Sequence, residues 1–334
     1  MNTEEKINPG SLKAEVIGYR ALKTLKSTST KLTVYGVFDH ALYLSNGNNQ
    51  LIKIIKNKEF ISSTSIVLRE TEGWSFKSAE IRNGMEIEVN KDSLVCNNNK
   101  FNIDIENAST WHPTKSTGNT GLLSIEEINL NLRILRDVIY TAPSREGLIP
   151  LLENVELYGP LKFFLQPQEP IVSERARPYI DGLMWGLFGG DLEMIIKNVE
   201  PILGLGPGLT PSCDDFLAGL ILSLNAGGPA LFRKEDRADK FFKKISEEIC
   251  ILANKKTTVY SQSLLNDARL GEGPKAILDL IYGLITENAD QVFKVSKTVI
   301  GMGDTSGADM AIGIYYGIRF LISRIELKDL HETA

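Results

Sequence analysis

The chain has 334 residues, of which 43% are hydrophobic and 24% charged, and its formal net charge at pH 7 is -5. This composition is typical of a globular protein longer than one average domain, so we expect two domains. The acidic balance argues against a nucleic-acid partner, and the apolar stretches are too short or too interrupted to predict a membrane-spanning helix.

The N-terminus and the cysteines point to one compartment. The first ten residues are polar and lack the apolar core of a secretory signal. Three widely spaced cysteines, Cys96, Cys213 and Cys250, include no Cys-x-x-Cys pair. We therefore expect a cytoplasmic protein without a zinc site.

Residues 31–113 are predicted to form an antiparallel, barrel-like β domain. Short runs with strand character alternate with turn signals such as Asn46-Gly47 and Asn83-Gly84, at distances typical of hairpins. The runs are Leu32–Tyr35, Ala41–Leu44, Leu51–Ile55, Ser65–Leu68 and Met85–Val89.

A small, polar segment, residues 114–121, separates this half from a helical one, and we place a domain boundary there. The expected domains are a β-rich domain at 1–120 and a mainly α-helical domain at 121–334. A first helix is predicted to begin at Ser124 and end by Pro143. Further helices are expected at 175–188, 191–200, 214–225, 237–253, 274–286 and 308–324. Strands and helices do not alternate, so the fold class is α+β rather than a doubly wound sheet.

The helical half contains the skeleton Ser-x-x-Asp-x-x-x-Gly twice. The two copies are Ser212, Asp215 and Gly219, then Ser306, Asp309 and Gly313. A serine at the N-cap with a carboxylate three residues later predicts a capping box, in which each side chain satisfies a backbone amide. The glycines four residues further on would let two helices approach closely and point their N-termini at one cavity.

The first copy follows a glycine-rich approach with Gly204, Gly206 and Gly208. Such glycines allow positive φ and bring backbone amides close to a ligand, so the loop through Leu209, Thr210 and Ser212 is predicted to bind an anion. The aspartates Asp214 and Asp215 lie in the first turn, where they would repel an anion unless one caps the helix and the other holds a metal or a substrate amide. The plainer alternative is a well-capped core helix.

The second copy follows Gly303, Asp304 and Thr305, which add amide donors and a carboxylate beside Ser306. Two weaker candidates lie elsewhere. Ser261 either serves a ligand or caps a helix, and the cap is the favoured interpretation. Arg177 either binds a carboxylate or phosphate or is simply solvated on a loop.

The segment from Gly204 to Gly219 resembles the signature of the AllH-like family, which is linked to the oxamate carbamoyltransferase of anaerobic allantoin degradation. Residues 37–41 and 303–309 add weaker support, and the resemblance covers most of the chain. A glycine is usual in the family where this chain has Cys213.

The resemblance implies a subunit that acts with an FdrA-like and an AllG-like partner to transfer a carbamoyl group between carbamoyl phosphate and oxamate. It implies phosphate at the amides of residues 206–210, the oxamate carboxylate at the Ser306 helix end, and the amide nitrogen at Asp214 or Asp304. The catalytic candidates are Asp214, Asp215, Asp304 and Asp309.

Two alternatives stay open. The string Gly303-Asp304-Thr305-Ser306-Gly307-Ala308-Asp309 is also similar to the aspartate-rich helix starts of ADP-ribosyl-glycohydrolases. That resemblance implies a hydrolase with Mg²⁺ at the same four aspartates, since hard cations prefer oxygen ligands. In the other alternative the chain is a non-catalytic scaffold subunit whose helix ends shape a partner's site.

Overall fold

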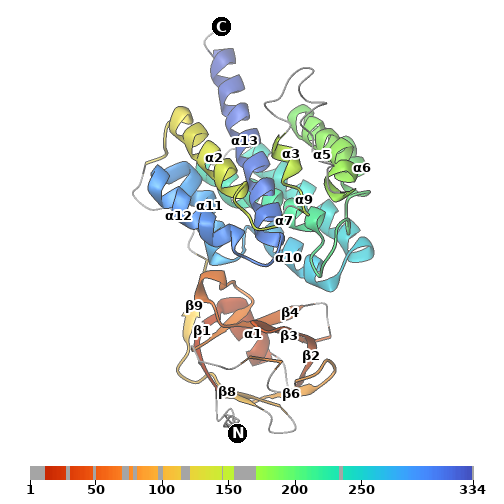
Figure 1. Cartoon of the computed structure of the whole chain (residues 1–334), viewed down its shortest axis with the longest axis vertical. Helices are drawn as coiled ribbons and strands as arrows, with labels where there is room; N and C mark the ends of the chain where they lie inside the picture. The colour runs from red at the N-terminus through yellow and green to blue at the C-terminus, as the bar shows by residue number, and fades with distance from the viewer. Residues whose placement is uncertain are drawn as a thin grey trace. The chain divides into compact units, whose positions relative to one another are not determined.

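The computed structural model of the chain (Figure 1) describes residues 12–27, 31–47, 50–69, 75–77, 81–96, 101–113, 121–144, 146–153, 171–232 and 236–332. The chain divides into two compact units, Met1–Thr114 and Lys115–Ala334. Most of the polar segment chosen from the sequence as the domain boundary, residues 114–120, lies outside the described residues.

The N-terminal unit is a closed β-barrel. Eight strands form a ring in the order β5-β4-β3-β2-β6-β7-β8-β1, which closes because β1 also pairs with β5. The strands of the ring are β1 (Leu12–Gly18), β2 (Lys31–Val37), β3 (Ala41–Ser45), β4 (Leu51–Ile55), β5 (Ser65–Leu68), β6 (Glu86–Val89), β7 (Ser93–Cys96) and β8 (Asn102–Asp104). A ninth strand, β9 (Ser109–Trp111), pairs with the second half of β1 after β8 has paired with its first two residues.

The barrel-like fold and the five predicted strands are confirmed, but the expectation of purely antiparallel pairing is wrong at three places. The pairs β4–β5, β1–β8 and β1–β9 are parallel. The parallel β4–β5 pair is possible because a crossover that includes the short 3₁₀ turn Lys58–Phe60 replaces a tight hairpin. Hairpin signals in sequence indicate only tight connections between consecutive strands. They therefore carry no information on the long-range pairs β1–β8 and β1–β9.

The barrel core is built from alternating positions, as expected for strands with one wet face. In β2, for example, Leu32 and Val34 are buried while Lys31, Thr33 and Tyr35 are exposed. One nine-residue helix, α1 (Tyr19–Ser27), buries Ala21 and Leu25 against this core, and its Arg20 and Ala21 amides donate to Ser63 O. The sequence interpretation did not include α1.

The C-terminal unit is helical. Its elements are α2 (Ile125–Ile139), α3 (Pro150–Glu153), α5 (Ile171–Gly189), α6 (Leu192–Val199), α7 (Ser212–Leu222), a π-helical segment (Ser223–Gly227), α8 (Gly228–Leu231), α9 (Asp236–Lys256), α10 (Val259–Arg269), α11 (Lys275–Thr286), α12 (Ala289–Ile300) and α13 (Ser306–Glu332). Helix α2 begins after Ser124, as predicted, and Ser124 forms a full capping box with Glu127. No helix within the described residues is long and apolar enough to cross a membrane.

Helices α7 and α13 cross at very close range in the middle of this unit (Figure 1). A Cβ placed on Gly219 would overlap the carbonyl oxygen of Met310, and one placed on Gly313 would overlap that of Phe216. The two motif glycines are therefore what allows the backbones to touch. This crossing places the beginnings of the two helices beside each other.

Candidate functional site

The two Ser-x-x-Asp-x-x-x-Gly motifs meet at the N-termini of α7 and α13. The hydroxyls of Thr210 and Ser306 lie 3.2 Å apart, within hydrogen-bond distance, although 96 residues separate them in the chain. Thr210 also donates a hydrogen bond of 3.0 Å to Asp215 Oδ2. The structure thus joins the two predicted ligand loops into one candidate site.

Neither motif forms the capping box expected from its sequence. Pro211, not Ser212, occupies the N-cap position of α7, and it contributes no side-chain cap. Asp215 turns to Thr210, and Asp309 accepts a 2.7 Å hydrogen bond from the Leu148 amide instead of capping α13. The prediction failed because the aspartates bind partners that are distant in sequence or outside the helix, which local spacing cannot reveal.

Asp214 fastens the glycine loop to the start of α10. Its Oδ1 accepts a 2.8 Å hydrogen bond from the Gly204 amide, and its Oδ2 accepts one from the Thr257 hydroxyl. The next residue, Thr258, donates a 2.6 Å hydrogen bond to the Leu209 carbonyl. The loop is held at both ends, and both carboxylate oxygens of Asp214 are already engaged.

The glycine loop itself presents unused amides. Gly204, Gly206 and Gly208 all have positive φ, of 77°, 126° and 95°. The amides of Gly206, Gly208, Leu209, Thr210 and Ser212 donate to no acceptor within the part of the chain that the structure describes. A Cβ on Gly206 would lie 2.5 Å from the Ser212 amide nitrogen, so only glycine fits here without displacing that amide. Such a row of amides before a helix N-terminus suits an anion.

Three buried carboxyls lie behind this loop, and burial raises the pKa of each. Asp214 and Asp309 are fully buried and Asp215 is 1% exposed. Burial raises the pKa of Asp309 to about 6, against the opposing effect of the Leu148 amide. Burial also raises the pKa of Asp214, and that of Asp215 well above its ordinary value, where Ser306 and Thr210 oppose it. A raised pKa disfavours the charged carboxylate, so burial reduces the repulsion of a bound anion that the sequence predicts for Asp214 and Asp215.

Buried polar atoms without partners gather at the same place. Asp309 Oδ2 and the hydroxyls of Ser212 and Ser261 complete no hydrogen bond among the described residues. Ser212 still lies near enough to Asp309, and Ser261 to Asp214, to lower the pKa of that carboxyl. A buried polar atom without a hydrogen-bond partner lowers the stability of the folded state. The clustering of three such atoms therefore indicates a functional site rather than an ordinary core.

Ser261 is not the helix cap favoured from the sequence. The cap of α10 is Thr258, whose hydroxyl accepts a 3.2 Å hydrogen bond from the Ser261 amide. The cap expected at Ser261 lies three residues earlier, at Thr258. Thr257, Thr258 and Leu148 are contributors that sequence reasoning missed; the two adjacent threonines were the only local signal.

The second loop keeps its predicted donors available. Gly303 has a φ of 67°, and the amides of Asp304, Thr305 and Ser306 meet no acceptor in the described portion of the chain. Asp304 is exposed, unlike the other three candidate aspartates. It is therefore the candidate carboxylate that a ligand reaches without rearrangement.

Two further candidates change character. Arg177 lies on α5 and not on a loop, and it donates a 3.1 Å hydrogen bond to the Pro150 carbonyl. Cys213 is fully buried, and burial raises the pKa of its thiol well above its ordinary range. Neither side chain is directed at the glycine loop by a described hydrogen bond.

The aspartates do not converge as metal ligands. Within the residues that the structure describes, no group of three or more His, Cys, Asp or Glu side chains could hold a metal ion. Asp214 and Asp215 direct their oxygens to different partners, and Asp304 is exposed whereas the other three are buried. The geometry does not support the Mg²⁺ alternative.

Two family models match the chain. Residues 202–318 match the model described as oxamate carbamoyltransferase subunit AllH, and residues 12–110 match the AllH family N-terminal domain. The first range contains both motifs, and the second covers the barrel. No solved structure matches the chain.

Proposed function

Because the chain belongs to the AllH family, a family of oxamate carbamoyltransferase subunits, we propose that it binds carbamoyl phosphate and oxamate at the meeting point of α7 and α13. One observation carries the proposal: a glycine loop with five unused amides stands directly beside a second loop with three. Two anionic substrates need two adjacent sets of donors, and backbone amides supply both without adding charge.

In the proposed arrangement the loop of residues 206–212 holds the phosphate group of carbamoyl phosphate. The amides at 304–306 hold the carboxylate of oxamate. The hydroxyls of Thr210 and Ser306 connect the two loops at 3.2 Å, so the substrates would lie side by side. Holding both reactants in contact is itself a large part of such catalysis.

The reaction is a single acyl transfer. The amide nitrogen of oxamate attacks the carbamoyl carbon, the bond from that carbon to the phosphate oxygen breaks, and the nitrogen loses one proton. Oxalurate and phosphate are the products. Of the two aspartates first considered for the amide, Asp214 has both oxygens engaged within the protein, so we assign the orientation of the nitrogen to exposed Asp304.

Partner subunits belong to the proposal because the family description is that of an enzyme subunit. We propose that FdrA-like and AllG-like chains complete the enzyme and that the reaction serves the use of allantoin nitrogen. A scaffold role for this chain predicts instead that the isolated chain binds neither substrate and that binding appears only with the partner subunits.

The test compares Gly206→Ala with Gly208→Ala in the reconstituted complex, using calorimetry with carbamoyl phosphate. Both glycines have positive φ, so both substitutions strain the backbone. Only at residue 206 would the new Cβ overlap an amide of the loop, that of Ser212, because at 208 the nearest atom is the Thr210 carbonyl oxygen at 3.8 Å. We expect at least about a tenfold loss of affinity for Gly206→Ala, which corresponds to about 1.4 kcal/mol, and a much smaller loss for Gly208→Ala.

Equal affinities for the two variants would contradict the assignment of the phosphate group to the loop of residues 206–212. Asp304→Asn tests the role of Asp304 in orienting the oxamate nitrogen. It should lower turnover while the affinity for carbamoyl phosphate stays unchanged. A complex that turns over normally with Asp304→Asn would remove that residue from the mechanism.

A further inference from the structure

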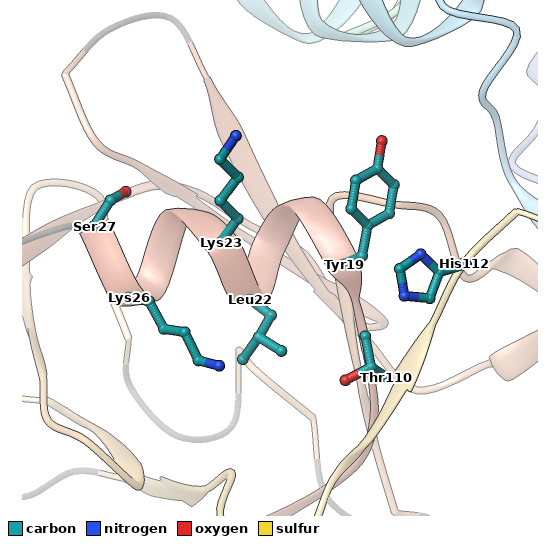
Figure 2. Close-up of a pocket in the computed structure, with 7 residues that line it drawn as sticks. All are labelled: Tyr19, Leu22, Lys23, Lys26, Ser27, Thr110 and His112. Atoms are coloured by element: carbon teal, nitrogen blue, oxygen red, sulfur yellow. The ribbon is translucent and has the colours of Figure 1, made fainter.

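The barrel unit has a hollow of its own, separate from the loops of the helical unit. It has a volume of about 520 Å³ and is lined by α1 and by residues at and just after β9 (Figure 2). The lining residues are Tyr19, Leu22, Lys23, Lys26, Ser27, Thr110 and His112. This volume falls within the range of small-molecule sites.

The hollow uses one continuous face of α1. Its α1 residues, 19, 22, 23, 26 and 27, follow the spacing of a single helix side, whereas Ala21 and Leu25 form the side packed into the barrel core. Tyr19 and Leu22 are half-buried, Tyr19 in contact with His112 and Leu22 against the barrel core, while Lys23, Lys26 and Ser27 are exposed. The face therefore combines partly buried apolar surface with exposed cations.

A flat surface lies at the N-terminal end of this face. The rings of Tyr19 and His112 are stacked with centroids 4.9 Å apart and planes 13° from parallel. Figure 2 shows the two rings side by side at the edge of the hollow, with Thr110 close by. A parallel ring pair is the kind of surface against which a planar ligand ring stacks.

The charge of the hollow is opposite to that of the chain. Lys23 and Lys26 line it, none of its described lining residues is acidic, and the whole chain has a net charge of -5. Neither lysine forms an ion pair within the described residues, whereas Lys31 of the same unit pairs with Glu86. Lys26 also lies in the last turn of α1, where the helix dipole favours a cation. The dipole does not explain the presence of Lys23, which lies outside that turn.

We propose that this hollow binds a small ligand in which a flat ring carries an anionic group, a phosphate or a carboxylate. The ring lies against the Tyr19–His112 pair, Leu22 contacts its apolar edge, and the lysines reach the anion through their flexible stems. The inference is independent of the carbamoyl-transfer proposal, because every residue it uses belongs to the barrel unit.

The test uses the full chain and observes the histidine rings by NMR. The chain has only three histidines, so a His112→Gln variant identifies the resonances of His112. The probes are adenosine monophosphate, benzoate, adenosine and inorganic phosphate. We expect a saturable shift of the His112 resonances with at least one of the first two, and at least tenfold weaker binding of adenosine and of inorganic phosphate.

The matched variants remove equal charge from two places. Lys23→Gln with Lys26→Gln should abolish the shift, and Lys58→Gln with Lys91→Gln, two exposed lysines outside the hollow, should not. Gly206→Ala should also leave it unchanged, which separates this site from the loop of α7. A response to adenosine monophosphate alone identifies phosphate as the anion, and a response to benzoate alone identifies carboxylate.

Three results would overturn the proposal: no His112 shift with either anionic ring, equal binding of adenosine and adenosine monophosphate, or a shift that survives loss of both pocket lysines. Thermal unfolding of each variant checks that the barrel is intact. The substituted lysines are exposed, so their loss should not impair folding.

Discussion

Thr257 donates a hydrogen bond to Asp214 across 43 residues of sequence, from the residue just before the α10 cap to the first turn of α7. The other oxygen of Asp214 accepts the Gly204 amide. The carboxyl therefore links a threonine on one segment with the beginning of the glycine loop. This makes Asp214 a positioning residue, since its oxygens are engaged with the protein and not available to a substrate.

Thr257→Val should loosen the glycine loop. The substitution preserves the shape of the side chain but removes the hydroxyl, so one oxygen of a fully buried carboxyl loses its donor. We expect a loss of about 1–3 kcal/mol in the free energy of unfolding, measured with urea. Thr257→Ser restores the donor and should recover most of it. Equal stability of the valine and serine variants would contradict the role given to this hydrogen bond.

Asp309 predicts a pH-dependent loss of stability. Burial raises its folded-state pKa from 3.8 to about 6, so the proton binds more tightly in the folded chain. The stabilisation from this group is fully present below about pH 4 and is lost as pH rises through about 6, amounting to about 3 kcal/mol.

Asp309→Asn cannot ionise and still offers an oxygen to the Leu148 amide. Relative to this variant, the wild type should become less stable between pH 4 and pH 7. Urea unfolding at four pH values in that interval measures the difference. Parallel stability curves for the two proteins would show that Asp309 keeps an ordinary pKa.

Gly219→Ala should disrupt the crossing of α7 and α13, because the added methyl would overlap the Met310 carbonyl oxygen. We expect a loss of several kcal/mol or failure to fold, as for other overpacked core positions. Gly283→Ala on α11 is the matched control, since its Cβ would have no neighbour nearer than 3.9 Å. Helix propensity there favours alanine by up to about 1 kcal/mol. Thermal unfolding of both variants shows whether stability depends on the close contact at Gly219 or on the loss of any helical glycine.

Cys213 should be inert in the folded protein. Burial raises the pKa of its thiol, and all three cysteines are free and buried. Iodoacetamide at pH 8 should therefore label none of them until urea is added, since only the thiolate reacts. Mass spectrometry of the native and unfolded protein counts the labels. Rapid labelling of Cys213 in the native state would show that the start of α7 opens in solution.

The sequence predicted those parts of the fold that local pattern determines. Strand-like runs between turn signals revealed the strands from β2 to β6, and Ser124 followed by Glu126 and Glu127 revealed the beginning of α2. The helix α12 was missed although Asn288 caps it and apolar residues such as Val292, Val299 and Ile300 recur at helical spacing. The closure of the barrel by β1 and β5 was beyond reach, since pairing between distant strands leaves no periodic mark.

The candidate site, like the fold, could be predicted from the sequence only in part. The glycines at 204–208 predicted an open loop, and the motif glycines predicted close helix packing. The partners of the aspartates were not predictable, because Leu148 and Thr257 are 161 and 43 residues away from the carboxyls they bind. A Ser-x-x-Asp spacing allows a cap but does not require one when a tertiary donor competes for the carboxylate.

The joining of α7 to α13 also determines when the site can form during synthesis. The ribosome makes the glycine loop about a hundred residues before Ser306, which supplies its neighbouring hydroxyl. Thr210 gains its Ser306 neighbour only when α13 has been made, so a chain that ends before Ser306 lacks the second loop of the proposed site.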